Sequence, residues 1–190
     1  EKGIWTGTRD AKLTLKGFED ARLLGDTLRD ISIDHAYASM QIRTMETLSS
    51  LLGTLQQPTV PITRDAALNE RDYGDYTGKN KHEMKEILGE EVFDKVRRGW
   101  NMPIPNGETL EAVYRRIVPF FLEEILTRLK RGENVLIVSH GNALRALIKY
   151  IENISDQDIE GVEMMFGGAI IYHLTEEGHM KTKELRETSA

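Results

Sequence analysis

The chain has 190 residues, of which 39% are hydrophobic and 29% are charged, which is ordinary for a globular protein with one core. Its net charge of −6 excludes a general attraction to nucleic acid or to anionic membranes. The absence of cysteine excludes disulfides, thiolate nucleophiles and cysteine zinc sites. No apolar run approaches the roughly 18 residues that span a bilayer, and no signal-peptide pattern is present. We therefore expect a cytoplasmic protein with a single domain over residues 1–190.

The first third of the chain predicts helices alternating with strands. Apolar residues recur at helical spacing over residues 14–29, and the segment HAYAS that follows predicts a short strand. Ser39 is expected to cap the next helix, whose apolar stripe runs over residues 42–55. Residues 68–81 (LNERDYGDYTGKNK) show no sustained period. They predict an ordered loop with functional potential.

The middle of the chain predicts charged and amphipathic helices. Residues 80–98 are helical in pattern and highly charged, and the segment GWNMPIPNG interrupts them with prolines and glycines. Apolar residues at helical spacing from Leu110 to Ile125 then predict a long helix that ends at Lys130-Arg131-Gly132 and that Pro119 should kink.

The last third predicts the parts that define the fold class. A strand over residues 134–139 leads into a helix over residues 142–152, and the segments AIIYHLT and HMKTKEL should pair as strands across a turn. This order predicts an α/β fold with three layers, in which a mostly parallel sheet is flanked by helices and has an antiparallel edge near the carboxyl terminus. Because such domains normally open with a strand, we expect the first strand to be missing from the sequence, which would then be amino-terminally incomplete.

His140 is the first candidate site residue. It follows a buried strand and precedes a helix, a position where helix N–H groups and the helix dipole favour an anion. It could be a hydrogen-bonded core histidine, a metal ligand or a phosphate contact. Metal is disfavoured, because no H-x-H or H-E-x-x-H spacing occurs. A phosphate contact fits best, since a charged imidazolium donates from both nitrogens and Gly141 leaves room for a ligand.

Three further places in the sequence carry candidate site residues. Arg43 lies in the first turn of a predicted helix, where a cation is disfavoured unless an anion compensates, although a solvated arginine or a surface ion pair would also explain it. In the 68–81 loop, Glu70 and Tyr73 stand near lysines, a mixture suited to proton transfer beside an anion, or simply an exposed polar loop. The pair Arg97-Arg98 would by itself be structural, complementing the dipole at a helix end.

Four segments together resemble a known family. They are SMQIRTMETL, LNERDYGDYTGKNK, VRRGWNMPIP and VLIVSHGNALRALIKYIENIS, and they occur in family order. They resemble the cofactor-dependent phosphoglycerate mutases of the histidine phosphatase superfamily. The resemblance runs from about Trp5 to the carboxyl-terminal strands.

This resemblance implies an isomerase that interconverts 2- and 3-phosphoglycerate in glycolysis and gluconeogenesis. It implies transfer through a phosphohistidine, with 2,3-bisphosphoglycerate as the priming phosphate donor and without a metal. His140 is similar to the second active-site histidine, which stabilises the transferring group. Glu70 is similar to the proton donor and acceptor, and Arg43 to the arginine that holds the transferring phosphate. The positions that match substrate-binding residues of the family are Thr6, Gly7, Tyr73, Lys81, Arg97, Arg98, Gly141 and Asn142.

The match to the family fails at the nucleophile. The family carries it in an Arg-His-Gly motif after the first strand, and this motif is absent from the sequence. Either the sequence lacks a native segment before Glu1, which we favour, or the natural protein has lost its nucleophile. The link from Pro105 to Glu108 is also short, as in short-type mutases, and a less covered pocket would admit water and favour hydrolysis.

Two other functions remain open from the sequence. A broad-specificity histidine phosphatase would hydrolyse varied phosphomonoesters without isomerising them. A non-catalytic protein that binds phosphometabolites would lack the upstream motif altogether. In each case the expected partners are small phosphorylated acids such as the phosphoglycerates, with no nucleic acid and no membrane, and the sequence leaves open whether the chain forms a homo-oligomer.

Overall fold

The centre of the molecule is a three-stranded parallel sheet. The computed structural model describes residues 3–165 and 167–188. The strands β1 (His35–Ala38), β2 (Ile62–Arg64) and β3 (Val135–Val138) lie in the order β2-β1-β3. Ala36 of β1 stands opposite Ile62 of β2 and Leu136 of β3. Because all three strands run the same way, the chain leaves β1 and β3 at one edge of the sheet, next to Ser39 and His140.

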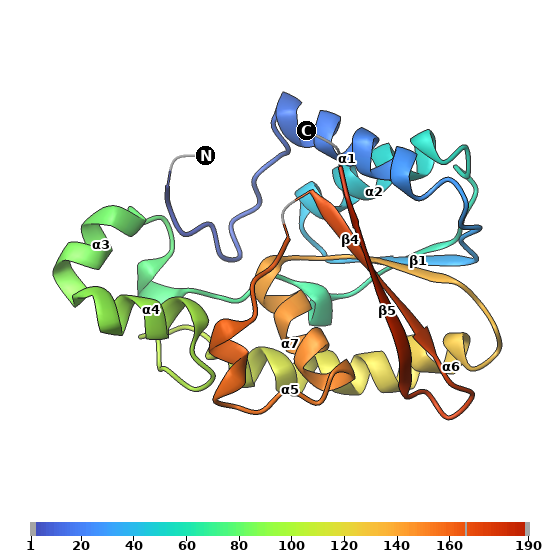
Figure 1. Cartoon of the computed structure of the whole chain (residues 1–190). Coiled ribbons are helices and arrows are strands. Elements are labelled where there is room, and N and C mark those ends of the chain that lie inside the picture. The colour runs from blue at the N-terminus through green and yellow to red at the C-terminus, as the bar shows by residue number, and fades with distance from the viewer. Residues whose placement is uncertain (1–2, 166, 189–190) are drawn as a thin grey trace.

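Helices cover both faces of this sheet (Figure 1). On one face, α1 (Leu15–Thr27) and α2 (Ile42–Thr54) enclose a core that includes the β-strand residues Ala36, Ala38 and Val138. On the other, α5 (Leu110–Phe120), α6 (Leu126–Leu129) and α7 (Gly141–Ile151) pack with Tyr37. Successive strand residues point to opposite faces, so each short strand contributes to both cores. The predicted three-layer α/β fold is confirmed.

The long helix expected after residue 110 changes its helix type just after Pro119. Pro119 lies inside α5, and the chain continues as the π-helical turn η3 (Phe121–Ile125) and then as α6. Proline has no N–H to donate to the preceding turn, and π turns and prolines are the usual causes of irregular helices. The predicted disturbance thus takes the form of a change in helix type.

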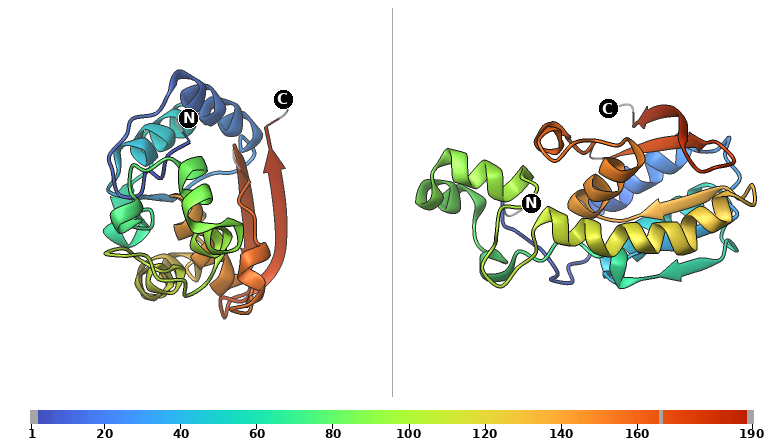
Figure 2. Two further views of the ribbon diagram at one scale, coloured as in Figure 1. Left: turned by 90° about the vertical axis from the view of Figure 1, so that its left-hand side faces the viewer. Right: turned by 90° about the horizontal axis from the view of Figure 1, so that it is seen from below.

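The charged stretch over residues 80–98 forms two helices. These are α3 (Lys81–Leu88) and α4 (Glu90–Arg98), and they stand at one end of the molecule (Figure 2). Gly89 between them has a φ of +77°, which ends α3 in a conformation that glycine adopts readily. A third cluster of buried residues, which includes Trp5, Tyr73 and Phe93, fixes these helices to the rest of the fold.

The carboxyl-terminal strands pair with each other, as predicted. β4 (Gly168–Leu174) and β5 (Met180–Glu187) form an antiparallel ribbon that crosses the sheet in Figure 1. The expectation that this pair forms an edge of the parallel sheet is wrong, since within the described residues the ribbon is a separate two-stranded sheet. Its apolar residues Ala169 and Ile171 pack on the core beneath α2 instead. None of the helices in the described ranges is both long and apolar enough to cross a membrane.

Candidate active site

His140 lies where β3 ends and α7 begins, and it is only 7% exposed. Its Nε2 lies 2.8 Å from Ser39 Oγ, and Arg43 Nε donates to its Nδ1 at 3.2 Å. A guanidinium N–H can only donate, so Nδ1 must be the acceptor and Nε2 must carry the proton. Burial, and then the charges of Arg43 and Arg116, lower the pKa of His140 to about 3. In this arrangement His140 therefore donates from Nε2 alone, and the imidazolium that donates from both nitrogens to a phosphate stays a prediction.

Ser39 orients the imidazole and does not cap the helix. Helix α2 begins at Ile42 with Gln41 as its N-cap, so the predicted cap is wrong. The Ser39 hydroxyl lies 2.8 Å from Thr44 Oγ1, which in turn donates to the Gln41 carbonyl at 2.8 Å. Because His140 Nε2 donates to Ser39, Ser39 donates to Thr44, and the chain of hydroxyls fixes the tautomer.

Arg43 lies in the first turn of α2, as predicted. Besides His140, its guanidinium donates to the carbonyls of Arg9 at 2.9 Å and Gly7 at 3.1 Å. Burial lowers its pKa, while the charges of Glu70 and Asp10 act in the opposite direction. Three of its five N–H groups are occupied by these bonds, and over the described residues it forms no ion pair. The remaining donors are the type of group that an anion would use.

The Glu70 carboxylate lies at the amino terminus of α7. Its Oε1 accepts from the backbone N–H of Arg71 at 2.8 Å and of Asn142 at 3.3 Å. The Glu70 carboxylate thus accepts from the first turn of the helix that follows His140, and the binding of an anion beside His140 stays a prediction. His140, Arg43 and Glu70, which are far apart in the sequence, therefore meet at one edge of the sheet.

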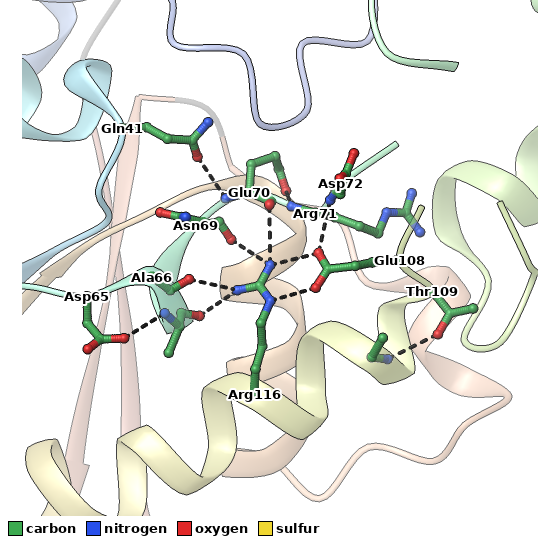
Figure 3. A network of polar contacts seen from close by, with 12 residues as sticks. Gln41, Asp65, Ala66, Asn69, Glu70, Arg71, Asp72, Glu108, Thr109 and Arg116 are labelled. Atoms are coloured by element: carbon green, nitrogen blue, oxygen red, sulfur yellow. Dashed lines mark hydrogen bonds and ion pairs between the residues drawn. The ribbon is translucent and has the colours of Figure 1, made fainter. Parts of the chain in front are cut away.

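Arg116 of α5 fixes the loop that carries Glu70 (Figure 3). It forms a two-pronged ion pair with Glu108, at 2.9 and 3.0 Å, and donates to several backbone carbonyls of residues 66–70. Burial raises the pKa of Glu108, but the hydrogen bonds from Arg116 and from Asp72 N outweigh burial and hold that pKa below its ordinary value. A backbone loop with several carbonyls bound to one cation is rigid.

A second group of cations lies on the α3 and α4 side. Lys81 is the first residue of α3, and its pKa is lowered by burial and then by the charge of Arg97, with Glu70 acting in the opposite direction. Arg97 lies over the Phe93 ring at 5.5 Å. The charges of both Arg97 and Glu70 therefore act on Lys81. Arg98 pairs with Glu163 at 2.8 Å on the surface.

Asn142, Tyr73 and Gly141 line the same edge. Asn142 Nδ2 donates to the Tyr73 hydroxyl at 2.9 Å, and its Oδ1 accepts from buried Arg145 at 3.2 Å. Burial, followed by the charge of Arg71, lowers the pKa of Arg145 to about 10. A methyl group on Gly141 would meet no atom within 4 Å, so the backbone there faces open space.

The amino-terminal segment brings Thr6 and Gly7 to this edge as well. Trp5 stacks on Tyr73 with ring centroids 5.4 Å apart. Gly7 has a φ of +52°, and a Cβ on it would lie 3.0 Å from Thr77 Oγ1, so glycine is required. The Gly7 carbonyl accepts a hydrogen bond from the Arg43 guanidinium. The Thr6 carbonyl accepts one from Arg9 N at 3.1 Å.

Four residues that bond to this site were not predicted from the sequence, namely Gln41, Arg71, Arg116 and Arg145. Arg71 is fully buried, lies 4.5 Å from the centroid of the Tyr73 ring, and donates to the carbonyls of Val96 and Arg97. A signal was available only for Arg145, because a cation on the apolar face of an otherwise buried helix needs buried partners. The contacts of the others join segments that are distant in the sequence.

The remaining histidines lie outside this cluster. His35 Nε2 lies 2.9 Å from Thr63 Oγ1, and His82 lies 3.5 Å from Glu86 on the surface. His173 is in β4 and His179 in the turn before β5. Within the described residues, no three histidine, aspartate or glutamate side chains are grouped as a metal site requires.

A surface hollow of about 490 Å³ lies between Phe18 of α1 and Met45 of α2. Neither His140, Arg43 nor Glu70 lines it. We therefore place the candidate site by its chemistry and not by its size.

Comparison with known proteins places the chain in a family. A sequence model of the histidine phosphatase superfamily (branch 1) matches residues 1–188. The chain belongs to this superfamily. It is 38% identical over 187 residues to a protein of Parvibaculum lavamentivorans named 2,3-bisphosphoglycerate-dependent phosphoglycerate mutase, covering 97% of this chain and 89% of that one. The predicted family is thus confirmed.

Solved structures of this superfamily agree with the fold. Phosphoglycerate mutase from Bacillus anthracis superposes with a TM-score of 0.69 at 26% identity, covering 80% of this chain and 73% of that one. The alpha-ribazole phosphatase from Shigella flexneri superposes with a TM-score of 0.73 at 24% identity, covering 99% and 89%. The fold is therefore shared by a mutase and by a phosphatase, and the choice between these activities depends on the site.

Proposed function

We propose that this histidine phosphatase superfamily member is a 2,3-bisphosphoglycerate-dependent phosphoglycerate mutase. It interconverts 2- and 3-phosphoglycerate through a phosphohistidine, which forms on the histidine of the Arg-His-Gly motif that the family resemblance implies and not on His140. The reaction takes place in the cytoplasm as a step of glycolysis and gluconeogenesis. The observation that carries the proposal is the meeting of His140, Arg43 and Glu70 at the carboxyl edge of β1 and β3. The names of the curated relatives support it.

Arg43 and the start of α7 are suited to hold the transferring phosphate. Phosphoryl transfer depends mainly on positioning and on neutralising negative charge. The Arg43 guanidinium is a cation with N–H groups left over from its three hydrogen bonds. Gly141 leaves space for a ligand against the amino terminus of α7. A phosphate dianion beside His140 favours the protonated imidazole, which can then donate from Nδ1 to the transferring group.

Glu70 is suited to carry the proton of the substrate hydroxyl. Its Oε1 is held by two backbone N–H groups, while over the described residues Oε2 accepts no hydrogen bond. One oxygen therefore fixes the carboxylate, and the other is available to a substrate oxygen. A positioned carboxylate of this kind acts as a general acid and base.

Lys81 and Arg97 provide a second set of charges for the carboxylate or second phosphate of a two-ended anion. With Arg43 for one phosphate and with Lys81 and Arg97 for the other end of the ligand, these cations would also serve 2,3-bisphosphoglycerate. When bound, that compound supplies the phosphate that primes the enzyme. Thr6, Gly7, Tyr73 and Asn142 complete the proposed lining. Arg98 would have to leave Glu163 to take part.

The test is phosphorus NMR of the protein made from its complete reading frame. Purified protein is incubated with 3-phosphoglycerate, with and without 2,3-bisphosphoglycerate. We expect 2-phosphoglycerate to form faster than inorganic phosphate, and faster when the bisphosphate is present. Formation of inorganic phosphate without 2-phosphoglycerate would refute the mutase assignment.

A broad-specificity phosphatase is the second candidate. The short link from Pro105 to Glu108 is a tight turn, in which Gly107 N bonds to the Ile104 carbonyl at 3.0 Å and Pro105 O accepts from Asp75 N at 3.0 Å. Such a turn has no length to cover the site, so water can reach a bound phosphate. When the protein is incubated with several other phosphomonoesters, phosphorus NMR would then show release of inorganic phosphate from each of them. A protein with neither activity would be a phosphometabolite-binding protein.

A further inference from the structure

Gln41 is a buried polar residue with an unusual arrangement of bonds. It is the N-cap of α2 but its side chain makes no capping hydrogen bond, and it is only 5% exposed. Its amide instead joins two loops of the site. Gln41 Oε1 accepts from Glu70 N at 2.9 Å, and Gln41 Nε2 donates to the Gly7 carbonyl at 3.1 Å.

Both ends of this bridge require an amide. A backbone N–H only donates and a backbone carbonyl only accepts, so the orientation of the Gln41 amide is fixed by its partners. An ionised glutamate has no hydrogen to donate to Gly7, and an apolar side chain of the same length satisfies neither group. Buried backbone groups without partners are costly, so the side chain constrains both loops.

The two loops do not depend on Gln41 equally. The Gly7 carbonyl also accepts from Arg43, which holds the Arg9 carbonyl as well. For Glu70 N, within the described part of the chain, Gln41 is the hydrogen-bond acceptor. Loss of the amide would therefore displace Glu70 more than the Gly7 loop.

The backbone of Gln41 is also linked to His140. Its N–H donates to Ser39 Oγ at 3.1 Å, and Ser39 Oγ lies 2.8 Å from His140 Nε2. One residue thus contacts the loop of the proposed proton carrier, the Gly7 loop and the hydroxyl that orients the imidazole. This arrangement suits the mutual positioning of groups that act in one reaction.

We propose that Gln41 is a positioning residue for Glu70 in the reaction, an inference that rests on the proposed function. It sets where the carboxylate lies relative to the oxygen that gains or loses a proton. Proton transfer depends steeply on distance, and a displacement of about 1 Å can lower a rate about 100-fold. The step most affected is the one in which a poor leaving group must be protonated.

The test uses Gln41→Met with Gln57→Met as the matched control, in protein from the complete reading frame. Gln57 forms the same kind of bridge, from Ile33 N at 2.8 Å to the Ile31 carbonyl at 2.9 Å, but near the other end of α2. Two substrates are compared. 3-Phosphoglycerate releases an oxygen that needs a proton, whereas the p-nitrophenolate of p-nitrophenyl phosphate leaves without one.

For Gln41→Met we expect kcat with 3-phosphoglycerate to fall by about 10- to 100-fold, with a loss below about 3-fold for p-nitrophenyl phosphate. Gln57→Met should leave both rates near those of the wild type. If Gln41→Met does not fold, Gln41→Asn keeps a buried amide that is too short to join both groups, and it should show the same selective loss.

Two results are distinguished by this design. Equal losses on both substrates, or equal behaviour of the Gln41 and Gln57 variants in an active protein, would overturn the positioning role. A wild-type protein that turns over neither substrate would instead refute the proposed function, and the positioning role with it.

Discussion

Replacement of Arg116 by methionine should destabilise the protein and release the loop of Glu70. Arg116 is the cation at the centre of Figure 3. Its ion pair with Glu108 has side-chain exposures of 24% and 27%, so less than a third of either group is in contact with solvent. Methionine keeps much of the length and apolar stem of arginine but removes every donor.

The loss of unfolding free energy in Arg116→Met follows from the groups that lose their partner. Removing one member of a buried ion pair costs about 3–5 kcal/mol, because the other charge stays buried and uncompensated. The remaining exposure of Glu108 lowers this estimate, while the carbonyls of Ala67, Asn69 and Glu70 lose donors at 2.6, 2.9 and 3.2 Å. We expect a loss of about 2–4 kcal/mol in the free energy of unfolding, or a fall in Tm of about 4–16 °C for a chain of this size.

The neighbouring Arg115 provides the control. It pairs with Glu111 at 2.6 Å on the same helix, but its side chain is 76% exposed. Such a surface pair contributes at most about 1 kcal/mol, so Arg115→Met should be nearly neutral. Urea unfolding followed by circular dichroism measures both variants, and isomerisation measures the effect on the site. Equal stabilities of the two variants would refute the assignment of Arg116 as the residue that fixes this loop.

Three further predictions concern other groups of the site. In the unliganded protein the pKa of His140 is lowered to about 3, so between that pH and about 6.5 the unfolded chain binds a proton that the folded one does not. The free energy of unfolding should therefore decrease as the pH is lowered from about 6.5 to about 3, by up to about 1.4 kcal/mol per pH unit, and His140→Gln should remove this component. An unchanged slope in pH-dependent unfolding of that variant would contradict it. Arg97→Ala should lower isomerisation more than hydrolysis of p-nitrophenyl phosphate, and Arg98→Ala should do so less because Arg98 pairs with Glu163; equal losses in both assays would argue against a second anion pocket. Tyr73→Phe should lower the unfolding free energy by about 1 kcal/mol, since Asn142 loses an acceptor, and denaturation curves that superpose with the wild type would show that the bond contributes nothing.

The sequence predicted those parts of the fold that depend on local patterns. The helix with its apolar stripe over residues 42–55 and the strand–helix junction at His140 are local features, and the structure contains both. Ser39 failed as a cap because its hydroxyl bonds to His140, a partner 101 residues away. Hydrogen bonds between such distant segments override the preference of a residue for a helix end.

The site shows the same division between local and distant information. His140 and Arg43 were found because each occupies an unusual position relative to its own helix. Gln41 and Arg116 carried no such signal, because a glutamine before a helix and an arginine within one are ordinary. Their roles arise from carbonyl and amide groups of the 66–70 loop, and sequence periodicity does not locate those groups in space. The prediction that a further strand with the nucleophile precedes Glu1 stays a prediction.

We expect Arg43, His140 and Glu70 to surround one bound phosphomonoester. A crystal structure of the protein from its complete reading frame, with 3-phosphoglycerate bound, tests this most directly. We predict a phosphate within hydrogen-bond distance of the Arg43 guanidinium and His140 Nδ1, with the carboxylate of the ligand directed to Lys81 and Arg97. A ligand bound elsewhere, such as in the hollow between Phe18 and Met45, would contradict the account.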